Sequence, residues 1–591
     1  MTRYRISGAV MTHPKRRAAA RILADSAPPG ALRVVMDPDP AGKPSVLRTA
    51  LAAWSSIEDG ATHQLVVQDD MILSASFFER ARAAVEAMPH AALALFALWD
   101  SRGGAAVRFG AMTGARWVGA VNEYFPCVAI ILPRDVAAGF VEYGRARLDA
   151  WPDDILMYQY LRSRKVPAYI SVPSLAEHED HGSISGNAFR GPRRSVCFLP
   201  DDEPVNEAAR LEGLRVLPFF KHGVAQCTVR VDGPGPERWL HLTCEEYLEG
   251  SGIRRERLDS AISRLTGADD PEAARGTWLT AFAMGFAHRR QGFGAELAST
   301  PVLAESLATI GPGGVSYTRS EERIAELRDN LARIAGAALE AGLDAGGRPG
   351  SRVRVPGPVI TLLGGASPLG EHIARGLTDR GHTIARARGA DPLRPGGAVI
   401  DLRPLRDGTA AAVTVRLHDG APGGMSVHTL HTGDLYGPGC PRDSVIGRLV
   451  WSALRSRPMA VTDPPGPPLR PLHVTDLITA LSAVVRNPPA ERSLTLADPA
   501  PLSVREVAEA IRAAVRPVPV ETVPTAGSTG PAGAENAGNA GKAVNAGNAE
   551  DTERGETGSR PAGWKPEMDL HHGLHTFMQW LAYEGIQYVP E

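Results

Sequence analysis

Short apolar runs and longer amphipathic segments alternate along the first 200 residues. The runs in 5–13, 31–37 and 63–68 predict strands, while 14–26 and 44–57 carry apolar residues every three or four positions and predict helices. Strands that are each followed by a helix are typical of a parallel sheet. We therefore expect an α/β fold at the start of the chain.

Acidic residues end two of these strands. Asp37 and Asp39 follow the second strand, and Asp69 and Asp70 follow the third. Because parallel α/β sheets bind ligands at the carboxyl ends of their strands, the four acids should lie along one edge. Two interpretations of the Asp69–Asp70 pair stay open: solvated turn or capping residues, or carboxylates that hold Mg²⁺ or Mn²⁺ at the phosphates of a nucleotide.

Later segments extend the pattern to about residue 195. "NEYFPCVAIILPRDVAAGFVEYG" predicts a further strand and helix, and "WPDDILMYQYL" predicts an acidic helix start. With "VVMDPDP", "VVQDDM" and "PSLAEHEDHGSISGN" in this order, residues 5–195 resemble a nucleotide-sugar-dependent glycosyltransferase of the GT-A type, close to those that decorate lipopolysaccharide and related glycans. The resemblance implies a GT-A-like mixed sheet with flanking helices over 1–199 and a nucleotide-sugar donor.

The resemblance also implies roles for single residues. Gln68, Asp69 and Asp70 stand at the family's D-x-D motif, where Asp70 would contact the metal and the other two would contact the donor. Asp37 would meet the base or ribose of the nucleotide, and His178 would complete the shell of Mn²⁺ or Mg²⁺. Gln68 is neutral where the family has an acid, which leaves metal dependence open.

On the acceptor side, the resemblance assigns the catalytic base to Asp153 or Asp154, whose carboxylate would remove a proton from the attacking hydroxyl. An acid at a helix start also satisfies free backbone N–H groups, so a capping role for Asp153 stays open. His178 and His181 could equally be surface-loop histidines, and Asp37 could simply begin a turn.

Residues 200–350 have a different character. The stretch 215–231 predicts strands, whereas 257–267, 274–290 and 319–342 predict helices. We interpret this part as a mainly helical connector or an acceptor-side subdomain. No candidate chemistry stands out in it.

The last part, 351–591, begins with a strand, a glycine turn and a helix. Gly364, Gly365 and Gly370 let backbone N–H groups approach a pyrophosphate at the helix N-terminus. Followed by "AVIDLRP", "HTGDLYGPGCPRDSV" and "RPLHVTDLITALSAVV", the turn resembles the extended short-chain dehydrogenase/reductase family, the NAD-dependent epimerases and dehydratases of nucleotide sugars, over about 358–585. The resemblance implies NAD or NADP bound at these glycines and at Asp401.

The sequence departs from that family in its catalytic residues. Its enzymes use a Tyr followed four positions later by a Lys, and no such pair occurs after residue 350. The interval between the glycine turn and "LYGPG" is also too short for two βαβ halves. We therefore expect a truncated, doubly wound Rossmann-like domain that binds or scaffolds, with a disordered Gly/Ala/Asn-rich insertion at 525–563.

Composition and charge limit the partners and the cellular location that we expect. The chain has 591 residues, 43% of them hydrophobic, and a formal net charge of -2, which gives no reason to expect nucleic acid as a partner. We expect no membrane span, no signal peptide, a cytoplasmic location and five reduced, scattered cysteines.

The predicted function is transfer of a sugar from a nucleotide-diphosphate donor to a hydroxyl or amine acceptor that the sequence does not identify. An NAD(P)-dependent nucleotide-sugar epimerase or dehydratase-like enzyme is one alternative, and a non-catalytic nucleotide-sugar-binding scaffold is another. The resemblance of the C-terminal part to the extended short-chain dehydrogenase/reductase family is also consistent with a homodimer.

Overall fold

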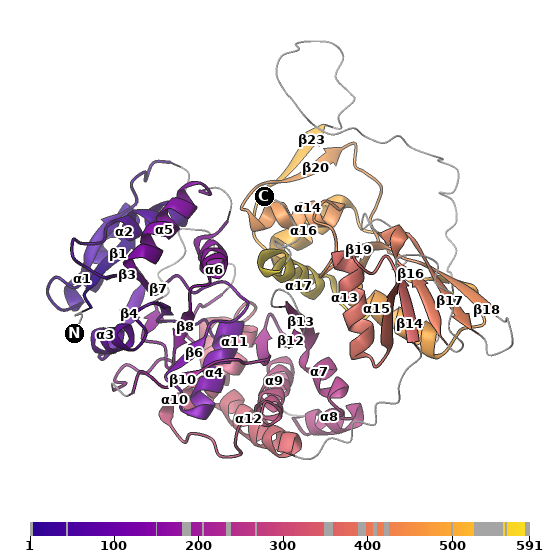
Figure 1. The fold of residues 1–591 in the computed structure, drawn as a ribbon, viewed down its shortest axis with the longest axis horizontal. Coiled ribbons are helices and arrows are strands. Elements are labelled where there is room, and N and C mark those ends of the chain that lie inside the picture. The colour runs from indigo at the N-terminus through magenta and orange to yellow at the C-terminus, as the bar shows by residue number, and fades with distance from the viewer. Residues whose placement is uncertain are drawn as a thin grey trace, which may run out of the picture. The chain divides into compact units, whose positions relative to one another are not determined.

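The structure is a computed structural model of the chain (Figure 1). Contacts between residues divide the chain into two compact units, Met1–Val353 and Arg354–Glu591. The structure describes residues 4–584 apart from 43–44, 149–150, 180–190, 204–205, 232–237, 266–268, 348–358, 388–396, 406–410, 419–424, 498–499, 525–558 and 562–563.

Unit 1 is built on an eight-stranded mixed sheet with the order β10-β6-β8-β5-β7-β3-β1-β2. β1 runs parallel to both β2 and β3, whereas β7 is antiparallel to β3 and to β5. The strands are β1 (Ile6–Thr12), β2 (Arg33–Met36), β3 (His63–Gln68), β5 (Ala92–Ala94), β6 (Trp117–Gly119), β7 (Ala129–Pro133), β8 (Ala168–Ser171) and β10 (Arg210–Leu211).

Helices cover both faces of this sheet because alternate residues of its central strands are apolar on opposite sides. Ala9 and Val66 lie in one core with residues of α2 and α5, and Val10 and Val67 lie in a second core with residues of α1 and α3 (Figure 1). The helices are α1 (Arg17–Ser26), α2 (Val46–Ser55), α3 (Phe77–Ala87), α4 (Arg102–Thr113), α5 (Arg134–Arg145) and α6 (Asp153–Arg164).

A short antiparallel ribbon follows the acidic pair. β4 (Met71–Leu73) begins directly after Asp70 and pairs with β9 (Ala176–His178), in the register Met71 opposite His178. The pairing brings two segments that are distant in sequence to the end of β3.

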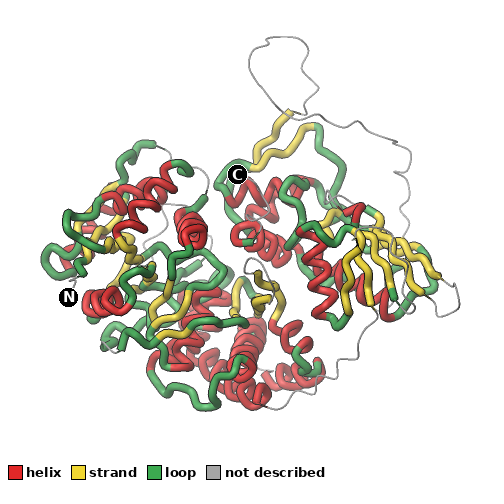
Figure 2. The backbone as a smooth tube through the Cα atoms, in the orientation of Figure 1, coloured by secondary structure: helices red, strands yellow, loops and turns green. Residues whose placement is uncertain are grey.

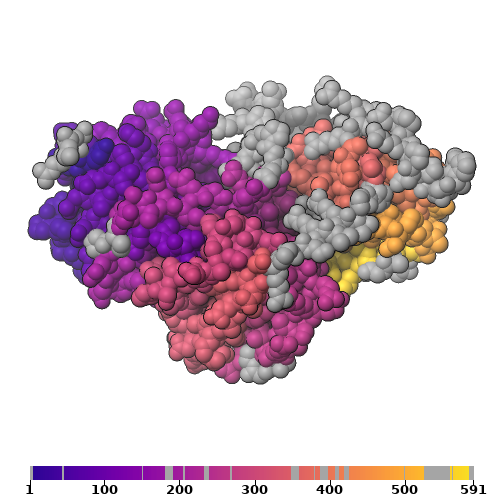
Figure 3. Space-filling model, turned by 60° about the horizontal axis from the view of Figure 1, so that its bottom comes forward, coloured from indigo at the N-terminus to yellow at the C-terminus, as the bar shows by residue number. Residues whose placement is uncertain are grey.

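Residues 200–347 pack into the core of the same unit. Phe282 and Leu331 share one hydrophobic cluster with Val66 of the sheet, and the two stretches form adjoining surfaces in Figure 3. This part holds a three-stranded antiparallel sheet and a group of helices (Figure 2). Its elements are β11 (Val216–Lys221), β12 (Val224–Val231), β13 (Arg238–Thr243), α7 (Cys244–Gly250), α8 (Arg255–Ile262), α9 (Pro271–Arg290), α10 (Pro301–Ala308), α11 (Ile310–Val315) and α12 (Glu321–Gly347).

Unit 2 has a six-stranded sheet with the order β15-β14-β16-β17-β18-β22. β14 is parallel to β15 and β16, but β17 runs antiparallel to both of its neighbours. The unit contains β14 (Val359–Leu363), α13 (Pro368–Asp379), β15 (Thr383–Ala387), β16 (Ala398–Asp401), β17 (Ala412–His418), β18 (Met425–His431), β19 (Asp434–Tyr436), α14 (Val445–Leu454), β20 (Met459–Asp463), β21 (Pro471–His473), α15 (Val474–Arg486), β22 (Ser493–Thr495), α16 (Val504–Ala514), β23 (Val520–Pro524) and α17 (Leu570–Tyr583).

These sheets confirm the predicted mixed α/β class, with one β-α-β unit of Rossmann type, β14-α13-β15, at the start of unit 2. After it, β16, β17 and β18 follow one another as antiparallel neighbours, which is the pairing of hairpins and not of β-α-β crossovers. Most of the predicted insertion 525–563 lies outside the described residues. None of the helices in the described ranges is long and apolar enough to cross a bilayer.

Candidate functional site

The carboxyl ends of β1, β2 and β3 meet at one edge of the unit 1 sheet because these three strands are parallel neighbours. β7 is antiparallel to β3, so it begins at the same edge, where Gln68 donates its backbone N–H to the carbonyl of Val128 at 2.8 Å. We call this edge, with the residues that follow the three strands, the acidic edge.

Asp69 and Asp70 are nearly buried at the acidic edge, with 9% and 8% of their surface exposed. The Thr12 hydroxyl at the end of β1 donates to Asp69 Oδ2. Arg16 Nη1 lies 3.2 Å from Asp69 Oδ1 and 2.8 Å from Asp70 Oδ2, so one guanidinium group bridges the two carboxylates. The pair is therefore held in place, which argues against the interpretation as freely solvated turn residues.

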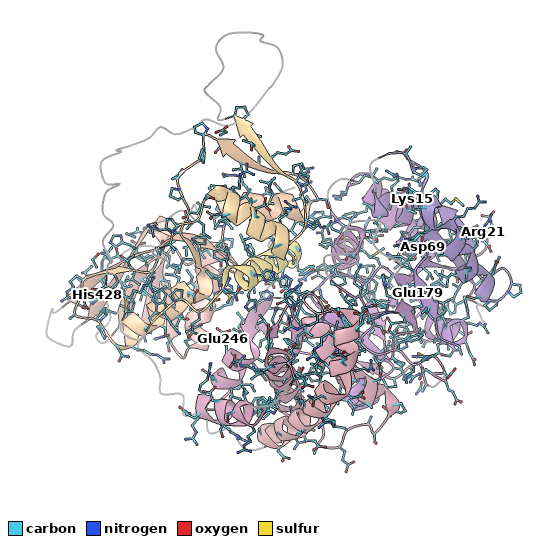
Figure 4. All side chains as sticks on the ribbon, turned by 180° about the vertical axis from the view of Figure 1, so that it is seen from behind. Lys15, Arg21, Asp69, Glu179, Glu246 and His428 are labelled. Carbon is cyan, nitrogen blue, oxygen red and sulfur yellow. The ribbon has the colours of Figure 1, made fainter. Side chains whose placement is uncertain are left out.

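His178 reaches the same carboxylates from β9. Its Nε2 lies 3.4 Å from Asp70 Oδ2, and the next residue, Glu179, donates its backbone N–H to the Asp70 carbonyl at 2.7 Å. Figure 4 shows Asp69 and Glu179 in one region of unit 1, together with Lys15. His181 lies outside the described residues.

The pKa values of the two acids shift in opposite directions. Burial raises the pKa of Asp69 above its ordinary value, and the hydrogen bond from Thr12 and the charge of Arg16 offset this only in part. Burial also raises the pKa of Asp70, but hydrogen bonds and charges from His178 and Arg16 outweigh it and bring this pKa below its ordinary value. Asp70 is therefore ionised at neutral pH.

A divalent ion, which the resemblance implies at this pair, does not fit the side chains that are present. Both oxygens of Asp69 are engaged, Gln68 is neutral, and Asp70 Oδ2 faces Arg16 and His178. No group of three or more His, Cys, Asp or Glu side chains suited to a metal ion occurs in the described part of the chain. Asp70 Oδ1 is buried and has no hydrogen-bond partner among the described residues.

Asp37 lies at the end of β2 and is paired with α2. Arg48 Nε and Nη2 lie 2.8 Å from its two carboxylate oxygens, and the hydrogen bonds from Arg48 hold the pKa of Asp37 below its ordinary value. Both oxygens thus have a protein partner. The ion pair between Asp37 and Arg48 therefore links the end of β2 to α2.

Asp153 and Asp154 open α6, as predicted from the sequence. Asp154 Oδ1 accepts the backbone N–H of Ile155, whereas Asp153 Oδ2 is buried with no hydrogen-bond partner among the described residues. Burial, and then the charge of Asp154, raise the pKa of Asp153 to about 7, although backbone N–H groups at the helix start lower it. Asp153 can therefore exchange a proton near neutral pH.

The start of α6 is bonded to the segment that precedes β7, where Phe125 donates its backbone N–H to the Asp154 carbonyl at 3.1 Å. Burial, followed by the charges of Asp153 and Asp154, raises the pKa of the Cys127 thiol, and Cys127 precedes Val128, the residue bonded to Gln68. On the other side, the charge of Arg193 acts on Asp153, and the next residue, Arg194, donates to the His178 carbonyl at 2.7 Å.

Sequence reasoning missed Thr12 and Arg16. Both follow from the position of β1 between β2 and β3, which places the "THPKRR" loop between the two acidic strand ends. A run of basic residues directly after the first predicted strand was the available signal.

The glycine turn of unit 2 brings the start of α13 close to the end of β14. Gly364 has a φ of +81°, and the Ser367 side chain caps α13 by accepting the Gly370 N–H at 3.0 Å. A Cβ on Gly370 would lie 2.5 Å from the Gly364 carbonyl, so only glycine lets the helix approach the turn this closely. These residues could hold the pyrophosphate of NAD or NADP at the N-terminus of α13.

Two further residues of unit 2, Asp401 and Tyr436, have partners within the unit. Asp401, at the end of β16, accepts hydrogen bonds from Arg403 on both carboxylate oxygens, at 2.8 and 2.5 Å. Tyr436 is 2% exposed, and burial raises the pKa of its phenol far above the ordinary value. It packs against Gly573 and His473.

Comparisons with solved structures find partial likenesses, whereas no family model and no curated protein matches the chain. UDP-glucose 4-epimerase of Thermotoga maritima, solved with UDP-glucose, is 12% identical with a TM-score of 0.19, over 26% of this chain and 44% of its own, less than half its length. UDP-glucose 4-epimerase of Thermus thermophilus, in complex with NAD, is 13% identical with a TM-score of 0.25, over 38% of this chain and 98% of its own.

dTDP-glucose 4,6-dehydratase of Bacillus anthracis, also in complex with NAD, is 13% identical with a TM-score of 0.25, over 38% of this chain and 97% of its own. The identities and TM-scores are low, so these likenesses assign no activity to this chain.

Proposed function

We propose that the chain is a GT-A type glycosyltransferase that moves a sugar from a nucleotide-diphosphate donor to a hydroxyl or amine acceptor. One observation carries the proposal: an ionised, nearly buried carboxylate, Asp70, meets His178 at the edge of a parallel β2-β1-β3 sheet. A second carboxyl group, Asp153, has a pKa of about 7 and opens a helix whose first turn is bonded to the segment before β7. Acids whose surroundings hold their pKa values apart are typical of acid–base catalysis.

In the proposed reaction, Asp153 acts as the general base. Its ionised carboxylate takes the proton from the acceptor hydroxyl while the acceptor oxygen forms a bond to the anomeric carbon of the donor sugar. The bond between that carbon and the diphosphate oxygen breaks, and the electron pair leaves with the diphosphate. The products are a glycoside, a nucleoside diphosphate and a protonated Asp153, which then releases its proton to water.

The acidic edge would bind the donor. Asp70 Oδ1 is a buried acceptor that needs a donor group, and the hydroxyls of a ribose or hexose supply one. Thr12 and Arg16 hold Asp69 beside it, so the hydrogen-bonding pattern is set before the ligand arrives.

The proposal is tested by incubating the purified full chain with UDP-glucose, GDP-mannose or dTDP-glucose and measuring release of nucleoside diphosphate, first to water and then to simple sugar alcohols. We expect release with one nucleotide class, and loss of that release in Asp70→Asn and Asp153→Asn. Absence of both binding and release with all three donors would contradict it.

For unit 2 we propose binding of a dinucleotide or nucleotide sugar without hydride transfer. The turn at Gly364–Gly370 supports binding. The buried Tyr436 supports the absence of a catalytic tyrosine.

A further inference from the structure

Arg16 stands between the two carboxylates of the acidic edge. It ends the 3-10 turn Pro14–Arg16 that connects β1 to α1, and its side chain is 15% exposed. One nitrogen, Nη1, contacts both Asp69 and Asp70. A guanidinium keeps its charge at every physiological pH, so the acidic pair carries a built-in cation.

This cation takes the place that a divalent ion would need. Mg²⁺ binds carboxylate oxygens at about 2.0–2.1 Å, whereas Arg16 Nη1 already lies 2.8 Å from Asp70 Oδ2 and 3.2 Å from Asp69 Oδ1. A divalent ion that bridges these same oxygens would overlap the guanidinium, and the two positive charges would repel each other.

The loop around Arg16 carries further positive charge. Lys15 and Arg17 flank it and are both exposed, so three consecutive cations follow β1, and the middle one contacts the two carboxylates. Arg and Lys are the side chains that recognise phosphate groups, Arg with two parallel N–H donors. The formal charge of these five residues is positive, which suits an anionic diphosphate.

We propose that Arg16 replaces the divalent ion of the donor site. Asp69 and Asp70 fix the guanidinium, Arg16 and Lys15 stabilise the nucleoside diphosphate as it leaves, and Asp70 Oδ1 accepts a hydroxyl of the donor. This inference rests on the proposed glycosyltransferase function. The bond changes are those given above, and the charge that develops on the leaving diphosphate is met by side-chain cations instead of a metal.

The test measures binding rather than turnover. Calorimetry would titrate UDP, GDP and dTDP into the full chain with EDTA and again with Mn²⁺, and electron paramagnetic resonance would measure free Mn²⁺ without nucleotide. We expect one nucleoside diphosphate to bind with dissociation constants that agree within twofold in the two buffers. Arg16→Gln should weaken this binding tenfold or more, and Mn²⁺ alone should stay free.

Arg21→Gln is the matched control because Arg21 lies on the exposed side of α1 (Figure 4), and it should leave the dissociation constant unchanged. Arg16→Lys keeps the charge, so it should fold and bind with intermediate affinity. Tight Mn²⁺ binding by the unaltered chain, or nucleotide binding that requires Mn²⁺, would overturn the inference and leave the glycosyltransferase proposal standing. Failure of all three nucleotides in both buffers would overturn both.

Discussion

Asp153 is the residue whose protonation should set the pH dependence of activity. A general base acts only when it is ionised, and burial raises its pKa to about 7. We therefore predict that kcat/KM rises with pH and levels off above about pH 7, the pKa of Asp153. Asp153→Asn should lower kcat by roughly a hundredfold or more while nucleotide affinity is kept, because general-base catalysis contributes about that much.

Asp154→Asn is the control for this measurement, since the Asp154 side chain accepts a helix N–H. It should lower the apparent pKa by removing a like charge and keep substantial activity. A pH profile unchanged by both substitutions would contradict the assignment.

The raised pKa of Asp153 also predicts that its ionised form destabilises the folded chain. Between its ordinary value of 3.8 and about 7, the folded chain holds the proton and the unfolded chain does not, so the contribution of Asp153 to stability falls as pH rises through this window. Asp153→Asn should therefore raise the melting temperature of unit 1 at pH 8 but not at pH 4. Calorimetry at the two pH values measures the difference, and a lower melting temperature at pH 8 would contradict the prediction.

At the residue scale, the resemblance to GT-A type glycosyltransferases implied one metal site containing Asp70 and His178, and the structure places their side chains 3.4 Å apart in direct contact. Arg16 could not be identified in the same way. Its role depends on the register Met11 opposite Gln68, which brings the loop after β1 to Asp69, and a basic residue before a helix is usually a surface charge.

At the element scale, the contact between α9 and α12 tests how residues 200–347 are held in unit 1. A Cβ on Gly342 of α12 would lie 2.1 Å from the Phe282 carbonyl of α9. Gly342→Ala should therefore lower the free energy of unfolding by about 1–3 kcal/mol, the usual cost of overpacking. Urea denaturation followed by tryptophan fluorescence measures the loss.

Gly336 supplies a control in the same helix because a Cβ there would meet nothing within 4 Å. Gly336→Ala should stabilise the chain by roughly 0.5–1 kcal/mol, the difference in helix propensity between the two residues. Equal effects of the two substitutions would show that the close helix contact is not what Gly342 preserves.

The ion pair between Asp37 and Arg48, which links β2 to α2, gives a second prediction at the scale of elements. The hydrogen bonds from Arg48 lower the pKa of Asp37, so its stabilising effect is present above the unfolded pKa and is lost as pH falls through the folded pKa. Arg48→Met should reduce stability on the order of 1–3 kcal/mol at neutral pH, the range for hydrogen bonds to a charged group. The reduction should shrink in acid, which denaturant unfolding at two pH values can measure.

The elements themselves were predictable to different degrees. β1, β2, β3 and their helices follow from the spacing of apolar residues along the chain. The glycine turn follows from the spacing of Gly364, Gly365 and Gly370, and the positive φ of Gly364 is a conformation that glycine adopts readily. The antiparallel course of β17 was not predictable, because a run such as Ala412–His418 looks the same in either direction and only its neighbours decide the pairing.

At the scale of the whole molecule, each unit carries one candidate nucleotide site of its own: the acidic edge in unit 1 and the glycine turn in unit 2. If the sites are separate, substitutions should affect one ligand each. Gly370→Val adds a side chain whose Cβ would lie 2.5 Å from the Gly364 carbonyl, so it should abolish binding of NAD(H) or NADP(H). Asp70→Asn removes a buried charge at the other site and should abolish binding of the nucleotide sugar.

Thermal-shift titrations of the two variants with each ligand measure this separation, since a ligand that binds only the folded state raises the melting temperature. We expect Gly370→Val to keep its response to the nucleotide sugar and Asp70→Asn to keep its response to the dinucleotide. Added dinucleotide should show no change in nicotinamide absorbance, because Tyr436 is buried and no Tyr-x-x-x-Lys pair exists after residue 350. Oxidation of a nucleotide sugar with NAD would instead make unit 2 the catalytic part, and the acidic edge would then be a second binding site.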